Sequence, residues 1–338
     1  MENLMKAICL TNSNGVKLQD VPKPIKAEQG HIIIKMEACG INAGDTAFIG
    51  GAFPKGSIPI SQYDICGVSG VGTVIEVGEG VPSTYNRNKV TVYRSLKFGE
   101  NIIGTWCEYA HLPFEQCSIL PDNLDAEDYS GSLVNIITAY SFLKQVTEEG
   151  HKGIICTAGN SATGIAMLGI CIANNFQIIS MVRTEDGKKE LEELGAKNII
   201  VQTDIDFKQQ LKDLSQQLPA TAVFDGVGGG ILNQIIDVLP FNSTIYSYGY
   251  LGGKTPLTIH TSILMKGITI KAFGNFRTKT VQNQQLLEKA LNDISKIIEM
   301  PHFKTKTGKK FKFEDINEAL RLFSSTGEKA VLYPFTIK

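Results

Sequence analysis

Short apolar runs alternate with turn-forming segments along the first third of the chain. Stretches such as KAICL, HIIIKMEA, VGTVIEVG and KVTVYRS are rich in Val, Ile and Thr, and segments such as PKPIKAEQG separate them. Runs of this length bounded by Gly, Pro and Asn predict β-strands. We therefore predict a mostly-β, barrel-like domain over residues 1–124.

The pattern changes near Leu124, where apolar runs begin to alternate with segments of helical periodicity. The predicted strands GIICT, FQIISMV, KNIIV and TAVFDGV are separated by predicted helices over residues 163–174, 185–194 and 206–217. Repeated βα units of this kind are typical of a doubly wound parallel sheet. We therefore predict an α/β domain over residues 125–271.

The last part of the chain returns to short, mixed elements. A helix is predicted over residues 280–299, then a basic strand-like stretch, a helix over 313–324 and the terminal strand KAVLYPF. We assign residues 272–338 to the first domain, so that the α/β domain is an insertion within it.

Composition and charge place the chain among globular proteins whose partner is a small molecule. Its 338 residues are 43% hydrophobic, and 33 Lys+Arg balance 34 Asp+Glu to a net charge of -1. This length suggests about two domains, and the charge provides no global field for nucleic acid or anionic membranes. One basic run is an exception, and its alternation favours a hairpin with one solvated face over a nucleic-acid site; it comprises Lys304, Lys306, Lys309, Lys310 and Lys312.

Cysteine usage and the N-terminal segment favour a cytoplasmic protein. Seven cysteines are scattered without a CxxC pair, which argues against a disulfide framework and a zinc ribbon. The start, MENLMKAICL, lacks the apolar core of a secretory signal. The longest apolar run, Gly164 to Ala173, is about half the length that crosses a bilayer.

A glycine-rich turn joins the predicted strand GIICT to the following helix. It reads Ala158-Gly159-Asn160-Ser161-Ala162-Thr163-Gly164, in the strand–turn–helix context of a dinucleotide fingerprint. Gly159 permits the tight turn, Gly164 permits close helix–strand packing, and backbone N–H groups at the helix start bind a pyrophosphate. Ser161 replaces the usual middle glycine and can donate to a phosphate oxygen. The alternative is a glycine-rich turn without a ligand.

Arg183 stands where an acidic residue usually contacts the adenosine ribose of NAD, about 20 residues beyond the loop. An arginine fork fits a 2'-phosphate, whereas a carboxylate would repel it. The sequence therefore favours NADPH over NADH. Lys188 can add positive charge one helical turn further on, or can belong to a solvated helix face beside Glu185 and Lys189.

Together these motifs resemble the medium-chain dehydrogenase/reductase superfamily, and within it the zinc-independent quinone oxidoreductase branch. The resemblance covers nearly the whole chain, and further segments carry it: ACGINAGD at 38–45, GVSGVGTVIEVGEG at 67–80, GTWCEYAHLP at 104–113, LVNIITAY at 133–140, ELGA at 193–196, VFDGVGG at 223–229 and GEKAVLYP near the end. It implies a GroES-like β domain in two segments around a Rossmann domain.

The resemblance also implies that the catalytic zinc of the alcohol dehydrogenases is missing. Those enzymes carry a cysteine where this chain has Asn42, and a His-Glu pair where it has Val68-Ser69. Because a catalytic zinc needs about three protein ligands, we predict no metal. Cys39 lies three places early and is interpreted as a packed thiol.

Without a Lewis acid, conjugate reduction of an enone or quinone is the favoured chemistry. Relatives often place tyrosines at positions where this chain has Ala47 and Phe53, so that proton donor is lost and water becomes the proton source. Tyr63 is a possible substitute or a packing aromatic. The resemblance places Asn42 against the nicotinamide ribose or the substrate; a buried turn asparagine is the alternative.

Further cofactor contacts follow from the resemblance and from the position of loops after predicted strands. Thr138 matches a threonine near the nicotinamide in relatives. Tyr248 and Gly249 follow the strand TIYSYG, and Asn275 and Arg277 follow ITIKAFG. Ligands of open α/β sheets bind outside the carboxyl ends of strands, so both loops are candidate walls of the cofactor site.

These observations predict an NADPH-dependent, zinc-free reductase of quinones or α,β-unsaturated carbonyl compounds, acting in the cleft between the domains. The alternatives are an enoyl-thioester reductase and an NADPH-binding protein without turnover. By analogy with relatives we expect a homodimer paired through the last strand of the α/β domain, about Ile268 to Phe273.

Overall fold

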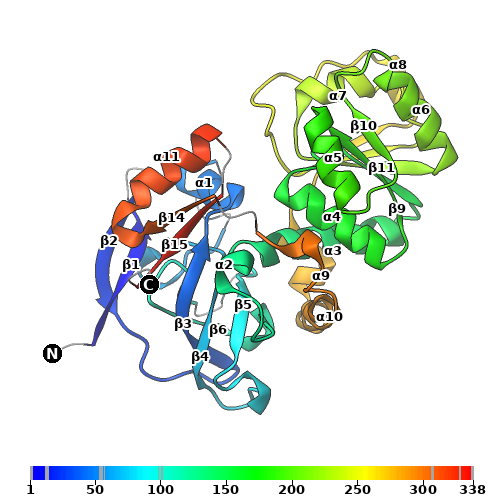
Figure 1. The fold of residues 1–338 in the computed structure, drawn as a ribbon. Helices are drawn as coiled ribbons and strands as arrows, with labels where there is room; N and C mark the ends of the chain where they lie inside the picture. Colours follow the sequence, from blue (N-terminus) through cyan, green and yellow to red (C-terminus); the bar gives the residue numbers. More distant parts are fainter. Residues whose placement is uncertain are drawn as a thin grey trace. The chain divides into compact units, whose positions relative to one another are not determined.

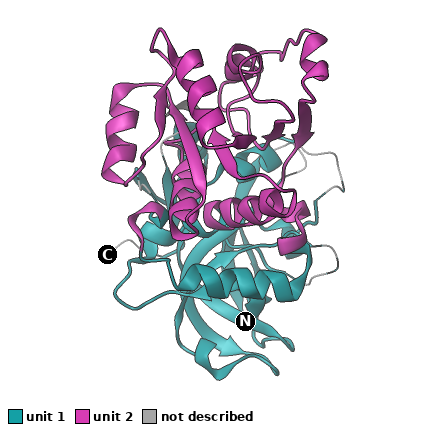
Figure 2. Ribbon diagram, turned by 90° about the vertical axis from the view of Figure 1, so that its right-hand side faces the viewer, with its two compact units in different colours: residues 1–134, 281–299, 303–338 teal, residues 135–280, 300–302 magenta. Residues whose placement is uncertain are grey.

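The structure, a computed structural model, describes residues 3–11, 15–52, 56, 58–97, 99, 102–305, 308–326 and 329–335. It divides into two compact units, coloured in Figure 2: unit 1 is Met1–Val134, Val281–Glu299 and Phe303–Lys338, and unit 2 is Asn135–Thr280 and Met300–His302. The boundaries follow residues 134 and 280 rather than 124 and 271. The first is later because the short helix α2 (Ala126–Tyr129) contacts strands of unit 1.

Unit 1 is built on a seven-stranded, mostly antiparallel sheet of order β14-β15-β3-β4-β5-β7, with β6 paired to β3 outside this path (Figure 1). Two further strands, β1 and β2, pair antiparallel with each other. The strands are β1 (Leu4–Leu10), β2 (Val16–Pro22), β3 (His31–Gly40), β4 (Ser69–Val77), β5 (Lys89–Tyr93), β6 (Tyr109–Pro113), β7 (Cys117–Ile119), β14 (Lys309–Lys312) and β15 (Ala330–Tyr333). Strands from both ends of the chain therefore share one sheet.

The helices of unit 1 are α1 (Ala43–Ile49), α2, α10 (Gln284–Ser295) and α11 (Ile316–Thr326). The apolar faces of α1 and α11 and the strands enclose one core, in which Trp106 is fully buried and donates from Nε1 to the Gly40 carbonyl (3.3 Å). α3 (Ser132–Glu148) begins in unit 1 and continues into unit 2, and α9 (Lys279–Gln282) spans the second boundary.

Unit 2 is a six-stranded parallel sheet of order β10-β9-β8-β11-β12-β13. Its strands are β8 (Gly153–Cys156), β9 (Gln177–Val182), β10 (Ile199–Val201), β11 (Ala220–Asp225), β12 (Thr244–Ser247) and β13 (Thr269–Ala272). β8 is buried along its whole length, as its unbroken apolar run requires in a sheet covered on both faces. The predicted α/β fold with a β-rich second unit is thus confirmed.

The helices of unit 2 follow the strands in alternation: α4 (Ala162–Ala173), α5 (Glu185–Glu193), α6 (Phe207–Gln217), α7 (Gly229–Ile235) and α8 (Ser262–Met265). α4 is buried from Gly164 to Cys171, because its sequence is apolar on every side and it packs against β9. α5 begins where the Thr184 hydroxyl accepts from Gly187 N (3.3 Å). The three helices predicted before residue 218 begin and end within one residue of these bounds.

Two predictions for the last part of the chain are wrong. The expected hairpin in the basic stretch does not form, because β14 pairs in parallel with β15 and α11 provides the crossover between them. The helix expected over residues 280–299 is interrupted at Asn283, whose extended backbone and side chain cap α10 by accepting from Leu286 N (3.0 Å).

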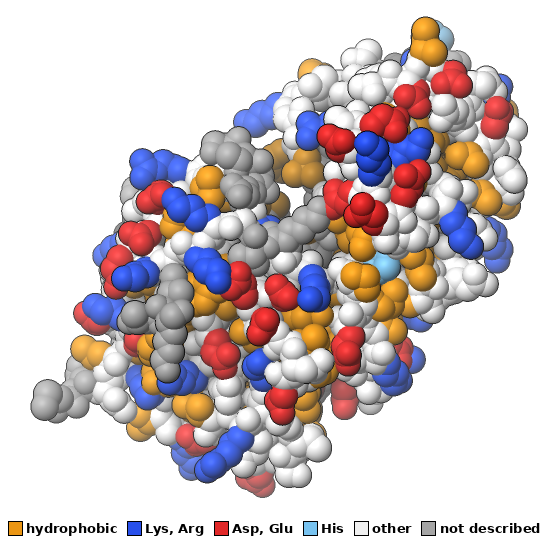
Figure 3. Space-filling view, viewed as in Figure 1, with side chains coloured by type: hydrophobic (Ala, Val, Ile, Leu, Met, Phe, Trp, Pro, Cys, Tyr) orange, Lys and Arg blue, Asp and Glu red, His pale blue; other side chains and the backbone are white. Residues whose placement is uncertain are grey.

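Three of the five lysines in the basic run are paired with acidic neighbours. Lys304 pairs with Asp128 (3.2 Å) and Lys309 with Glu318 (2.9 Å), while Lys310 pairs with Glu127. Lys306 lies outside the described residues. On the face shown in Figure 3, acidic and basic side chains are interspersed, which fits the solvated face that the alternation predicts.

All seven cysteines are free and buried, and Cys39 donates to the Thr105 carbonyl from Sγ (3.0 Å). Burial raises the pKa of the Cys39 thiol, with Asp45 adding to the effect. The prediction of a packed thiol is confirmed. Within the described ranges, no helix is long and apolar enough to cross a membrane.

Candidate functional site

The glycine-rich loop of unit 2 is packed against the neighbouring strand. Gly159 N donates to the Met181 carbonyl on β9 (2.8 Å), and a Cβ on Gly159 would approach that oxygen to 3.0 Å. A Cβ on Gly164 would lie 2.1 Å from the Ala158 carbonyl oxygen. Gly164 therefore allows α4 to start directly against the loop, whereas the sequence predicted that it serves helix–strand packing. The φ angle of Gly159 lies outside the left-handed region that favours glycine. A glycine is therefore needed here because the loop approaches β9 closely.

Ser161 begins α4 as its N-cap. Its hydroxyl accepts from Gly164 N (3.1 Å) and donates to the Ala158 carbonyl (2.8 Å), which explains why the loop holds a serine in place of a glycine. The first helical hydrogen bond runs from Ile165 N to the Ser161 carbonyl (2.8 Å). The N–H groups of Ala162 and Thr163 precede it, so they are free of helical acceptors and available to an anion.

Asn160 and Thr163 flank the start of α4. Asn160 is exposed, and its Nδ2 donates to Glu190 on α5 (3.5 Å). Thr163 is partly buried and donates from Oγ1 to the Asn135 side chain on α3 (2.7 Å). The loop is thus connected to α3 and α5 on either side.

Arg183 follows β9 directly and is exposed. Its guanidinium has no ion-pair partner among the residues that the structure describes. Lys188, on α5, lies 3.8 Å from Glu185, and both side chains are more than a third exposed. Arg183 is therefore available to an anionic ligand at this edge of the sheet, whereas Lys188 already has an acidic neighbour.

Asp225, at the end of β11, joins three neighbouring strands and was not singled out from the sequence. The carboxylate is fully buried and accepts from Thr157 Oγ1 (2.7 Å), from Val227 N and Gly228 N (3.2 Å each) and from Ser247 Oγ (3.4 Å). These bonds satisfy the buried charge. They also fix the carboxyl ends of β8, β11 and β12, where the ligands of doubly wound sheets bind.

Tyr248 and Gly249 follow β12 and lie next to the end of β11. The Tyr248 ring stacks on Phe224 (4.0 Å between centroids), and its hydroxyl lies against Gly226, where an added Cβ would be only 2.5 Å away. Burial raises the pKa of Tyr248 well above its usual value, while Ser161 of the loop lowers it. A Cβ on Gly249 would lie 3.0 Å from the Gly226 carbonyl, so two backbones approach closely here.

Asn275 and Thr138, predicted separately, meet in the structure. Asn275 Nδ2 donates to Thr138 Oγ1 (2.7 Å), which links the segment after β13 to α3. Arg277, two residues on, is exposed, and its guanidinium lies 5.4 Å from the Phe276 ring centroid. The residues predicted in unit 2 thus all lie on α3, on α5 or in the segments that follow β8, β9, β12 and β13.

The Asn275–Thr138 bond predicts a measurable coupling. We expect Asn275→Ala and Thr138→Val each to lower the free energy of unfolding, and the double variant to cost about 1 kcal/mol less than the sum, because the second change removes no further bond. Urea denaturation of the four proteins measures this. Strict additivity of the two effects would show that the bond contributes nothing.

In unit 1, Asn42 is held between two chain segments that are distant in sequence. Its Nδ2 donates to Ser69 Oγ (2.8 Å) and its Oδ1 accepts from Lys329 Nζ (2.7 Å). The pairing of β3 with β15 explains this, because Asn42 follows the end of β3 and Lys329 precedes β15. The side chain is buried and caps α1, which is the turn role considered as its alternative.

Asp45 completes this cluster from the first turn of α1. Its carboxylate is 3% exposed and accepts from Asn42 N (2.9 Å). Burial raises the pKa of Asp45 to about 6, although its hydrogen bond from Asn42 and the charge of Lys329 oppose the rise. Burial likewise lowers the pKa of Lys329 to about 8, against the attraction of Asp45.

The raised pKa of Asp45 predicts a loss of stability as pH rises. The folded chain holds this proton more tightly than the unfolded chain, so stability present below about pH 4 is lost as pH passes about 6. Asparagine has no carboxyl group to titrate. In Asp45→Asn we therefore expect the fall in unfolding free energy over this pH range to be smaller by up to about 3 kcal/mol. Urea denaturation between pH 4 and 7 measures it, with the exposed Asp237→Asn as the control. Parallel pH profiles for wild type and Asp45→Asn would contradict the expectation.

Tyr63 is exposed, so the structure bears on its alternative as a packing aromatic, while its role as a proton donor stays a prediction. The ring is 46% exposed, and Tyr63 and Asp64 both adopt positive φ angles (55° and 56°) in a single turn of 3-10 helix. It is therefore not buried as a packing aromatic, and it is not among the hydrogen-bond partners of Asn42. Ala47 lies on α1, and Phe53 lies outside the described residues.

Comparison with known proteins identifies the chain's family. A model of the alcohol dehydrogenase GroES-like domain matches residues 28–122, and a model of zinc-binding dehydrogenases matches residues 162–292. The chain therefore belongs to the medium-chain dehydrogenase/reductase superfamily. Quinone oxidoreductases are among the proteins to which it is similar.

Three relatives illustrate the match. The synaptic vesicle membrane protein VAT-1 homolog of Homo sapiens is 27% identical over 255 residues, which are 73% of this chain and 61% of that protein. The chain thus spans about three fifths of the length of this relative. A quinone oxidoreductase of Sus scrofa is 23% identical over 291 residues, 84% of each protein. A mycobacterial structure complexed with NADPH has a TM-score of 0.74 and 21% identity, covering 98% of this chain and 100% of that one.

The residues present do not fit the zinc ion that one family model implies. Asn42, Val68 and Ser69 occupy the places of the ligands and provide neither a thiolate nor an imidazole. In the part of the chain that the structure describes, no three His, Cys, Asp or Glu side chains are grouped so that they could hold a metal. The chemistry proposed for this chain uses no metal ion.

Proposed function

We propose that the chain is an NADPH-dependent reductase of quinones or α,β-unsaturated carbonyl compounds. The observation that carries the proposal is the exposed Arg183 beside a phosphate-binding loop, at the position where an NAD-binding protein presents a carboxylate. The N–H groups of Ala162 and Thr163, which have no helical acceptors, would bind the pyrophosphate, and Arg183 the 2'-phosphate. The NADPH-bound relative of similar fold supports this assignment.

Bound NADPH supplies a hydride, which a quinone or enone accepts to give a hydroquinone anion or enolate. The pair Asn275 and Thr138 would position the nicotinamide, and the buried Asp225 network keeps the strand ends rigid beneath it. Lys329 and Ser69 fix both ends of the Asn42 amide, which would orient substrate or ribose. Water provides the balancing proton, since Ala47 replaces one tyrosine of the relatives.

A substrate screen tests the proposal. The purified, chelator-treated protein is assayed for oxidation of NADPH and of NADH with 1,4-benzoquinone, an alkyl vinyl ketone and crotonyl-CoA. We expect NADPH oxidation with the first two acceptors. Faster turnover of crotonyl-CoA would assign an enoyl-thioester reductase. Tight NADPH binding without turnover of any acceptor would assign a binding protein, and a preference for NADH would contradict the proposal.

A homodimer paired through β13 belongs to the same proposal. β13 ends the described sheet, and Thr269, Ile270 and Ala272 on it are exposed. An open strand edge with an apolar side chain accepts the same strand of a second copy. Light scattering should give twice the mass of one chain, and a monomer at micromolar concentration would contradict this.

A further inference from the structure

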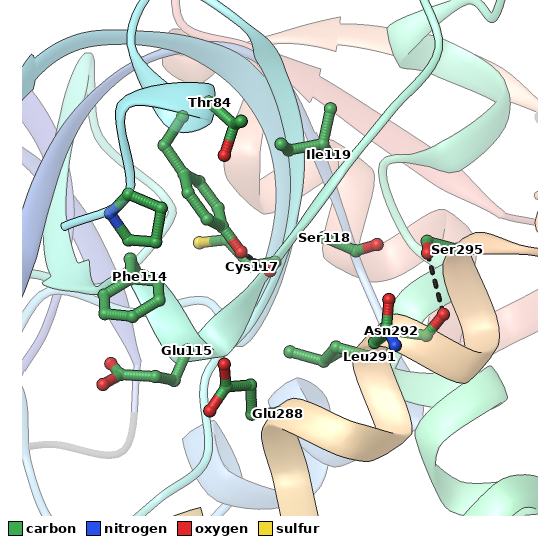
Figure 4. Close-up of a pocket in the computed structure, with 12 residues that line it drawn as sticks. Thr84, Phe114, Glu115, Cys117, Ser118, Ile119, Glu288, Leu291, Asn292 and Ser295 are labelled. Atoms are coloured by element: carbon green, nitrogen blue, oxygen red, sulfur yellow. Dashed lines mark hydrogen bonds between the residues drawn. The ribbon is translucent and has the colours of Figure 1, made fainter. Parts of the chain in front are cut away.

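A cavity of about 250 Å³ lies within unit 1, between the edge strand β7 and helix α10 (Figure 4). Turns around Tyr85 and Phe114 form its other walls. Its volume lies just below the range of about 300–1,000 Å³ typical of drug-sized ligands, so it suits a smaller molecule. Because every wall belongs to unit 1, the cavity is independent of the proposed nucleotide site.

One side of the cavity is apolar and aromatic. Tyr85 and Phe114 pack edge to face, with ring centroids 5.3 Å apart, and Leu291 of α10 lines the cavity with them. The Tyr85 hydroxyl is already used, since it donates to the Cys117 carbonyl (3.1 Å). The rings therefore offer faces and edges rather than a polar group, which suits the apolar body of a ligand.

Two carboxylates, Glu115 and Glu288, line the same cavity, and its described lining contains no Lys or Arg. Glu115 accepts from Gln284 Nε2, while Glu288 is exposed and has no ion-pair partner among the described residues. Burial raises the pKa of Tyr85, and the charges of Glu288 and Glu115 raise it further, so both carboxylates lie within electrostatic range of one ring. Negative charge beside aromatic faces favours an organic cation.

The inner wall presents a hydroxyl without a partner. Ser118 of β7 is 3% exposed, and its Oγ has no hydrogen-bond partner in the described part of the chain. Figure 4 shows the hydroxyl directed toward α10, across the cavity. Buried hydroxyls are normally hydrogen-bonded, so an unpaired one that lines a cavity indicates a missing polar partner.

We propose that this cavity binds a small organic ammonium ion with an apolar or aromatic body. Its ammonium group would lie between Glu115 and Glu288, and its body against Phe114 and Tyr85. A hydrogen-bonding group on the body would pair with Ser118 Oγ. The negative charge of the two carboxylates, the faces of the two aromatic rings and the Ser118 hydroxyl together define the class of ligand that the cavity accepts.

Three matched probes test the charge requirement. Tyramine has the ammonium, ring and hydroxyl; 4-ethylphenol has the same ring without the charge; 3-(4-hydroxyphenyl)propionate carries a negative charge instead. We expect isothermal titration of the full chain to show tyramine bound about tenfold more tightly than 4-ethylphenol, and the anion not bound. Absence of tyramine binding at millimolar concentration, or equal binding of the three, would overturn the proposal.

Variants place the binding in this cavity. Glu288→Gln should weaken tyramine binding about tenfold, and Leu291→Trp should abolish it by filling the cavity. Glu299→Gln, an exposed carboxylate beyond α10 that does not line the cavity, is the matched control and should bind as wild type. Circular dichroism verifies that each variant is folded. Wild-type affinity in both Glu288→Gln and Leu291→Trp would locate the binding elsewhere and overturn the proposal.

Discussion

Replacing Arg183 by Asp should reverse the cofactor preference of the chain. The ratio of kcat/KM for NADPH over NADH is expected to fall by about a hundredfold or more. The variant loses charge-assisted hydrogen bonds to the 2'-phosphate, worth about 1.5–3 kcal/mol, and its new carboxylate repels that phosphate. Since each 1.4 kcal/mol is tenfold, the two effects together exceed two decades. NADH binding should improve, because a carboxylate at this place accepts from the ribose hydroxyls.

Lys188→Gln is the matched control for Arg183→Asp. Lys188 lies one helical turn beyond Arg183 but has Glu185 3.8 Å away, so removing its charge should change the ratio less than about threefold. Steady-state kinetics with both cofactors at fixed ionic strength measures the effect. Retained NADPH preference in Arg183→Asp would refute the role of the arginine.

The second large effect is expected from one methyl group added to the glycine-rich loop of unit 2. In Gly164→Ala the new Cβ would lie 2.1 Å from the Ala158 carbonyl oxygen and 2.6 Å from that of Gly159. Both obstacles are backbone atoms, so α4 must move away from the loop. We expect about 3 kcal/mol of lost unfolding free energy and loss of measurable NADPH binding.

Gly230→Ala provides the comparison for Gly164→Ala. Gly230 lies in α7, and an added Cβ would meet no atom within 4 Å. Alanine there should raise the unfolding free energy by up to about 1 kcal/mol, through helix propensity alone. Urea denaturation and quenching of protein fluorescence by NADPH measure the two properties. Normal NADPH affinity in Gly164→Ala would show that the loop does not depend on this close packing.

The sequence was sufficient to predict the fold of unit 2. Its strands are unbroken apolar runs and its helices start at local caps such as Thr184, so each element is specified by adjacent residues. Reasoning from adjacent residues failed where a strand pairs with another segment of the chain. The orientation of β14 depends on β15, and the basic alternation is the same in a parallel or an antiparallel pair.

In the candidate site, too, residues that belong to a local motif could be predicted, whereas a residue brought in by distant strand pairing could not. Gly159 and Gly164 could be named from a motif, and Arg183 from its distance beyond that motif. Lys329 could not, because only the pairing of β3 with β15 brings it to Asn42, 287 positions away. For Asp225 a signal was present, since a carboxylate ending the apolar strand ATAVFD must be buried with partners.

The insertion of unit 2 has a consequence for biosynthesis. A ribosome completes every strand of the parallel sheet, from β8 to β13, before β15 is translated. During that interval Cys39 and Gly40, at the end of β3, lack the strand that later pairs with them, and unpaired strand edges can recruit other chains. Unit 2 can thus fold while the sheet of unit 1 is unfinished, and premature termination before β15 should yield insoluble product.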